Sequence, residues 1–158
     1  MVGRDNYGGP MYVVRTDSDG IQTWDSSISY GDFFWGSDVI DLGGTNGYMV
    51  SAGMENDTND YMCLMKLNEG GSPVWNSTHG GPDTEYCFGM TASTDGGFVL
   101  CGTTSSWGSG NYDMYIVKYD ASGNLQWNRT YGGTGNEMCM SITTAPDGGY
   151  MLAGYAPG

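Results

Sequence analysis

The pattern of apolar and polar residues along this chain favours short β-strands. No stretch repeats apolar residues at the i, i+3, i+4 spacing of an amphipathic helix. Short apolar or alternating runs are instead separated by turn dipeptides such as Asp19-Gly20, Gly70-Gly71 and Ser122-Gly123. Glycine in such dipeptides readily adopts the positive φ that a tight hairpin needs. We therefore predict an all-β fold built from antiparallel hairpins.

One segment occurs three times along the chain. Trp24, Trp75 and Trp127 are 51 and 52 residues apart, and each ends a similar stretch: "MYVVRTDSDGIQTW", "MCLMKLNEGGSPVW" and "MYIVKYDASGNLQW". Four strands can be placed in each period. A repeat of this length that contains strands and no helix predicts the four-stranded antiparallel blades of a β-propeller.

The repeat begins and ends in the middle of a blade. Residues 11–31 correspond to strands three and four of one blade, and residues 137–154 correspond to strands one and two. Residues 35–81 and 85–133 each form a complete blade between them, so the whole chain, 1–158, is one domain with three blade equivalents. Because propellers need about four to eight blades to close, we predict a homodimeric, six-bladed ring in which the termini of two chains complete each other's split blade.

Two local features test this strand assignment. In the first repeat, Asn46-Gly47 replaces the Gly-Gly pair of "TDGGFVLCG" and "PDGGYMLAG", and asparagine tolerates positive φ, so we expect Asn46 to occupy that turn position. The third strand, "MYIVKYD" in the last copy, is apolar without clean alternation. This pattern is typical of a strand covered on both faces.

Composition limits the possible partners. The formal net charge is −13 and the isoelectric point is near 4.1, which disfavours nucleic acids and anionic membrane surfaces. There is no apolar run long enough to be a transmembrane helix, and the amino terminus "MVGRDNYGG" lacks the apolar region of a signal peptide. No sequence motif indicates a cofactor or a metal site.

Three stretches, "DGGYMLAG", "DMYIVKYDASGNLQW" and "TYGGTGNE", resemble the repeats of bacterial and archaeal β-propeller families. Blades of those families carry Asp-Gly-Gly-Tyr, Asp-x-Tyr-x-x-Lys and Trp-x-x-Thr-x-Gly-Gly signatures. The first repeat departs from the pattern, with Pro10 and Thr45 in place of Asp113 and Asp95. The resemblance implies a propeller fold and an extracellular or cell-surface location, and it transfers no catalytic residue.

Five residues are candidates for ligand binding. Glu85 and Glu137 occupy matching positions before the inner strand, with Trp35 at the same position of the remaining copy. Such carboxylates could bind a metal or a sugar, although a hydrogen bond to a turn is the favoured interpretation. Trp107 and Tyr112 lie in the loop "SSWGSGNYD", where aromatic rings could stack on a sugar, anchor a protein, or pack against their own blade.

Charged residues recur with the repeat. Arg15, Lys66 and Lys118 share one position, and we expect each to meet a neighbouring carboxylate, as in Asp120 beside Lys118. A cationic ring for an anionic ligand is the alternative. The loop "ENDTND", residues 55–60, could hold Ca²⁺ or be an acidic solvated turn, since it lacks the spacing of a known calcium loop.

The remaining reactive residue types indicate no chemistry. His79 falls where the next copy has Tyr131, so a catalytic role is not expected. The four cysteines (Cys63, Cys87, Cys101 and Cys139) match no metal-binding spacing, and we expect them to be buried and reduced.

These observations favour a non-enzymatic binding or structural module. A sugar-binding, lectin-like propeller and a metal-dependent hydrolase or lactonase-type propeller are the alternatives. The expected partners are a second copy of the chain and, beyond it, a glycan or another protein.

Overall fold

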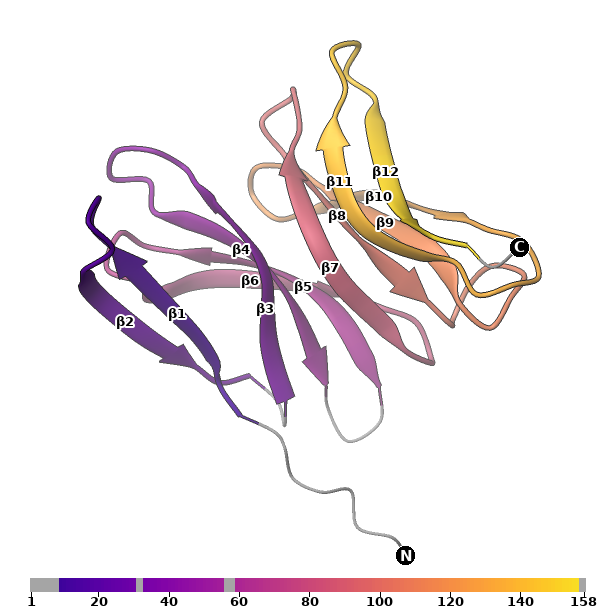
Figure 1. The fold of residues 1–158 in the computed structure, drawn as a ribbon, viewed down its shortest axis with the longest axis horizontal. Coiled ribbons are helices and arrows are strands. Elements are labelled where there is room, and N and C mark those ends of the chain that lie inside the picture. The colour runs from indigo at the N-terminus through magenta and orange to yellow at the C-terminus, as the bar shows by residue number, and fades with distance from the viewer. Residues whose placement is uncertain (1–8, 31–32, 56–58, 157–158) are drawn as a thin grey trace, which may run out of the picture.

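The computed structural model describes residues 9–30, 33–55 and 59–156. In these ranges the chain forms twelve strands in four antiparallel sheets of two, four, four and two strands, which confirms the all-β prediction (Figure 1). Strands that pair within a sheet are also neighbours in sequence. Each sheet is therefore a series of hairpins.

The two end sheets are single hairpins, and the two middle sheets have four strands each. Sheet 1 contains β1 (Met11–Thr16) and β2 (Gln22–Ile28). Sheet 2 contains β3 (Phe33–Asp41), β4 (Tyr48–Glu55), β5 (Asp60–Leu67) and β6 (Pro73–His79). Sheet 3 contains β7 (Glu85–Ala92), β8 (Phe98–Thr104), β9 (Asp113–Tyr119) and β10 (Leu125–Tyr131). Sheet 4 contains β11 (Met138–Thr144) and β12 (Tyr150–Tyr155).

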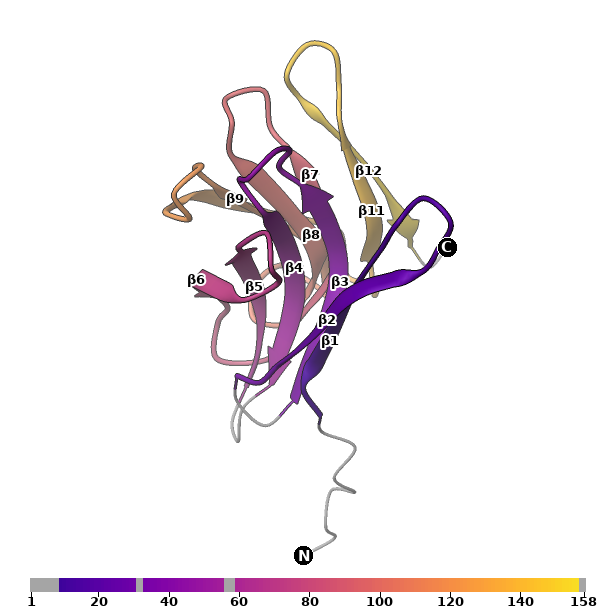
Figure 2. The same cartoon turned by 90° about the vertical axis from the view of Figure 1, so that its left-hand side faces the viewer.

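The sheets stack face to face in the order of the sequence. The first strand of each sheet lies against the preceding sheet: β3 contacts β1, β7 contacts β3 to β5, and β11 contacts β7 to β9. Sheets 1 and 4 therefore lie at opposite ends of the stack, as Figure 1 shows, and Figure 2 views it from the sheet 1 end. The described elements of one chain form no closed ring.

A separate apolar core fills each space between sheets. The cluster between sheets 2 and 3 includes Leu64 and Leu100, and the one between sheets 1 and 2 includes Met65. Leu64 and Met65 are adjacent on β5, point to opposite faces and are both fully buried. The third cluster, between sheets 3 and 4, includes Ile116 of β9. The unbroken apolar runs of β5 and β9 thus reflect burial on both faces, as the sequence predicted.

The turns follow the glycine pattern, with one correction. Gly20, Gly71 and Gly123 have φ of +79°, +78° and +83° in the predicted turns. In the β3–β4 turn, however, positive φ is found at Gly43 (+76°), Gly44 (+57°) and Gly47 (+78°), and Asn46 does not adopt it. The reason is turn length: residues 42–47 connect the paired strand ends here, whereas residues 93–97 connect them between β7 and β8. The longer turn has its left-handed residues at other positions than the β7–β8 turn, where Gly96 alone is left-handed, and Asn46 is not one of them.

Candidate functional site

Glu85 lies at the start of β7 and is completely buried. Its carboxylate accepts hydrogen bonds from the Thr104 hydroxyl (2.6 Å) and from the backbone N–H of Gly81 (2.7 Å), which lies in the β6–β7 turn. A buried carboxylate must be satisfied in this way to remain stable. Glu85 therefore stabilises the β6–β7 turn by a hydrogen bond, which is the interpretation that the sequence favoured.

Glu137 repeats this arrangement one sheet later. Its carboxylate accepts a hydrogen bond from the Gly133 N–H at 3.0 Å. The expected match of Trp35 to these two residues is wrong by one position. Phe34 pairs with the seventh residue of β4, just as Glu85 pairs with the seventh residue of β8, because the longer β3–β4 turn shifts the register. Trp35 corresponds instead to Tyr86.

Trp35 and Tyr112 both lie beside one tyrosine, Tyr86. The ring of Tyr86 is 6.2 Å from that of Trp35 and 6.4 Å from that of Tyr112, and Phe88 adds a third neighbour at 6.3 Å. Burial, together with the nearby carboxylate of Asp60, raises the pKa of Tyr86. This aromatic row joins β3, β7 and the β8–β9 loop. It is a contact that strand periodicity alone does not reveal.

Trp107, the other aromatic candidate, packs across two sheets. Its ring stacks on His79 of β6 with centroids 5.7 Å apart and planes within 12°, and it lies 5.2 Å from Tyr115 of β9. It remains 38% exposed. Partial burial lowers the pKa of His79, with Glu85 acting in the opposite direction. His79 is thus part of an aromatic stack with Trp107 and Tyr115.

The buried cation of β9 has a carboxylate partner, but not the expected one. The Nζ of Lys118 donates hydrogen bonds to the Oδ1 of Asp95 (2.8 Å) and to the carbonyl of Tyr119 (3.0 Å). The side chain of Asp120 is directed to its own turn, where its Oδ1 accepts from the N–H groups of Ser122 and Asn124. Asp95 lies in the β7–β8 turn. This turn lies beside β9 because β8 pairs with β7 on one side and with β9 on the other.

The Asp95–Lys118 pair predicts a pH-dependent stability. The hydrogen bond from Lys118, followed by that from the Gly97 N–H, lowers the pKa of Asp95 from 3.8 to about 2. Because the folded-state pKa is the lower one, the pair stabilises the fold above the unfolded-state pKa and its contribution disappears as the pH falls through the folded-state value. Urea unfolding from about pH 6 to about pH 2 should show this loss in the wild type and a flatter profile in Asp95→Asn. Lys118→Met should flatten it too; an unchanged profile in both variants would contradict the pairing.

The other two basic residues of this repeat position have different surroundings. Arg15 on β1 is exposed and donates a long hydrogen bond, 3.4 Å, to Thr23. Lys66 on β5 is half-buried. The first repeat has Thr45 where Asp95 stands in the next. Because the three basic residues of this repeat position have such different surroundings, the structure does not favour a uniform cationic ring.

All four cysteines are buried and free, as expected. Burial raises the pKa of Cys63 and of Cys87 to about 12, which keeps both thiols protonated at neutral pH. Of the possible calcium loop at residues 55–60, positions 56–58 lie outside the described residues. Elsewhere, the described chain contains no group of three or more His, Cys, Asp or Glu side chains that could hold a metal ion.

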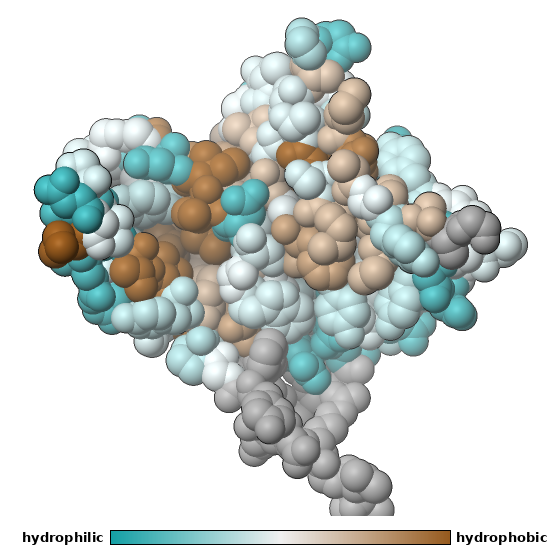
Figure 3. Space-filling model, in the orientation of Figure 1, coloured by the Kyte–Doolittle hydropathy of each residue, from teal (hydrophilic) through white to brown (hydrophobic). Residues whose placement is uncertain are grey.

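The two end sheets expose apolar side chains, a feature that the sequence motifs did not indicate. On β1, Tyr12 and Val14 are 59% and 43% exposed, and on β12, Met151 is 68% exposed. Figure 3 shows apolar residues (brown) at the surface over the left of the molecule, where sheets 1 and 2 lie. Each end sheet also presents a strand, β1 or β12, that pairs on one side only among the described elements. Unpaired strand edges are templates for further strands.

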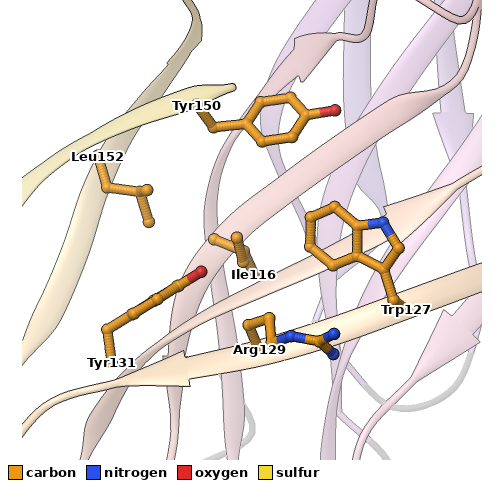
Figure 4. A pocket seen from close by; sticks show the side chains of 6 residues that line it. All are labelled: Ile116, Trp127, Arg129, Tyr131, Tyr150 and Leu152. Carbon is orange, nitrogen blue, oxygen red and sulfur yellow. The ribbon is translucent and has the colours of Figure 1, made fainter. Parts of the chain in front are cut away.

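A pocket of about 290 Å³ adjoins the open edge of β12. Trp127, Arg129 and Tyr131 of β10 form one wall, and Tyr150 and Leu152 of β12 face them (Figure 4). Ile116 of β9 lies between the two walls. The pocket is thus a gap between sheets 3 and 4, beside the open edge of the two-stranded sheet 4.

The sequence matches no protein-family model and no curated protein. In the ranges that the structure describes, no helix is long and apolar enough to cross a membrane.

Proposed function

We propose that this chain is a β-propeller-type binding or structural module, and that two copies assemble into a closed, six-bladed ring. The two end sheets carry the proposal. Sheet 1 has the last two strands of the repeat and sheet 4 has the first two, so each is the half that the other lacks.

The strand count supports two copies. The described part of one chain has twelve strands, the number in three four-stranded blades. Two chains provide six blades, within the range of about four to eight that propellers adopt. A two-fold axis forms both joints at once and removes both pairs of open sheet edges. The similarity of the repeats to those of bacterial and archaeal propellers supports the same architecture.

The candidate residues favour binding or structure over catalysis. Glu85 is buried and already accepts two hydrogen bonds, and Glu137 accepts one from its turn. His79 lies within a stack of aromatic rings. A general acid or base must reach a substrate, and these contacts direct the side chains to the fold instead.

Light scattering coupled to size exclusion tests the assembly. We expect a mass near 2 × 16.9 = 33.8 kDa at micromolar concentration. Deletion of residues 137–158, which removes sheet 4, should abolish this dimer because neither joint can then form. A folded wild-type monomer, or a stable dimer of the deletion variant, would contradict the proposal.

A further inference from the structure

We propose that β12 of one chain pairs with β1 of a second copy in one defined register, and that this joint is locked by an ion pair between Arg15 and Asp147 and by closure of the pocket at Trp127. The inference rests on the proposed ring and specifies the surface through which the second copy binds.

The hairpin partners β8 and β9 provide the template for the register. β12 matches β8 because each follows the same Asp-Gly-Gly turn, at 147–149 and 95–97. β1 matches β9 because their following turns are built alike. Asp17 accepts hydrogen bonds from the N–H groups of residues 19 and 21, and Asp120 accepts them from the N–H groups of residues 122 and 124.

This correspondence fixes which residues lie opposite each other. In sheet 3, Val99 pairs with Lys118, Leu100 with Val117 and Cys101 with Ile116. The equivalent pairs across the joint are Met151 with Arg15, Leu152 with Val14, and Ala153 with Val13. A shift of one residue would turn the apolar side chains of β1 to the wrong face.

Burial differs sharply between equivalent positions. Tyr115 and Val117 of β9 are fully buried against sheet 2, whereas the equivalent residues of β1, Tyr12 and Val14, are 59% and 43% exposed. The same apolar side chains thus serve as core in the middle of the stack and as surface at its end. Sheet 1 of a second copy, added to sheet 4, would place Tyr12 and Val14 against sheet 3 and bury them.

The contact between a turn glycine and the tryptophan of the preceding sheet also differs between the middle and the ends of the stack. Gly71 packs on the ring of Trp24, and Gly123 packs on the ring of Trp75, so closely that a Cβ on either glycine would lie 2.5 Å from the indole. Gly20, the equivalent glycine of the β1–β2 turn, has no atom within 4 Å of the position its Cβ would occupy. In sheet 3, the tryptophan equivalent to Trp24 and Trp75 is Trp127, which lines the pocket in Figure 4. The β1–β2 turn of the second copy would cover Trp127 and fill this pocket.

The charged residues at the equivalent positions of β1 and of the β11–β12 turn also match. Within sheet 3, Lys118 binds Asp95 of the preceding hairpin turn, and Asp95 also accepts the Gly97 N–H at 2.9 Å. Asp147 repeats this turn geometry, accepting the Gly149 N–H at 2.9 Å. Arg15 occupies the Lys118 position, and in the described residues β1 is the first strand of sheet 1, with no hairpin turn before it. The joint brings Arg15 and Asp147 together from two chains.

Charge reversal of Arg15→Asp and Asp147→Arg tests the joint directly. Each variant alone places like charges at both joints, so its dimer dissociation constant should rise at least about tenfold at low salt. An equimolar mixture should restore the dimer. One joint of that heterodimer retains the native Arg15–Asp147 pair, and the other carries the same pair reversed.

Asp83→Arg is the matched control, since it makes the same charge change at an exposed site in the β6–β7 turn. It should dimerise like the wild type. The outcomes separate the two proposals. A monomeric wild type overturns the ring itself. A dimeric wild type whose two variants dimerise normally, or whose weakened variants fail to rescue each other, overturns only this joint and leaves the ring to be formed through another surface.

Discussion

Gly102→Ala should destabilise the fold more than any surface change. Gly102 is buried on β8, and a Cβ at this position would overlap the carbonyl oxygen of Tyr86 on β7. The overlap arises because the register of β7 and β8 shifts between Cys87 and Gly89 and brings the two backbones together. A backbone must move to relieve it, so we expect the free energy of unfolding to fall by at least about 3 kcal/mol in urea titrations.

Gly89→Ala is the appropriate control for this prediction. It lies in the same irregularity, but its Cβ would be 3.4 Å from the sulfur of Cys101, an ordinary contact. This variant should retain the wild-type stability to within about 1 kcal/mol. Equal losses for Gly102→Ala and Gly89→Ala would show that the bulge tolerates no side chain at all, and that backbone overlap is not the cause.

Trp127→Ala should separate assembly from folding. Trp127 is half-buried in the open pocket between sheets 3 and 4, where the joint would bury it completely. Buried tryptophans at the centre of an interface are typical hot spots, and each is worth about 2 kcal/mol or more. Because the dimer contains two such joints, its dissociation constant should increase by about a hundredfold or more in sedimentation experiments.

Val74→Ala provides the comparison for assembly. Val74 lies on β6, the last strand of sheet 2, and is 55% exposed. In the proposed ring this position stays at the outer side of a blade, so dimerisation should not change. A normal dissociation constant for Trp127→Ala would mean that the pocket faces solvent in the assembly.

Strand number, strand order and turn positions could be predicted from the sequence because they depend on local chemistry. The last repeat shows this most clearly: the sequence predicts the first two strands of a blade in residues 137–154, and β11 (Met138–Thr144) and β12 (Tyr150–Tyr155) lie there. The turn glycines Gly20, Gly71 and Gly123 were recognisable since only glycine takes the required φ without strain. These features need only a few neighbouring residues to specify them.

The register and the partners of charged groups depend on residues distant in sequence. The extra residue before Tyr48 shifted the match of Trp35 by one, which repeat counting alone could not detect. Asp120 was expected at Lys118 because it is close in sequence, but Asp95 reaches Lys118 from 23 residues away. The stack of Trp107 on His79 joins different sheets. Only sheet-to-sheet packing decides such contacts.

Sequential pairing of the strands also has a kinetic consequence. Each sheet joins only strands that follow one another along the chain, so it forms through short loop closures whose rates do not depend on protein concentration. The joint proposed between β12 and β1 requires two molecules to meet. Folding of the stack is therefore a first-order event and closure of the proposed ring a second-order event, and at low concentration the two separate in time. During that interval the molecule exposes its open edges, and the rate of encounter sets how long it does so.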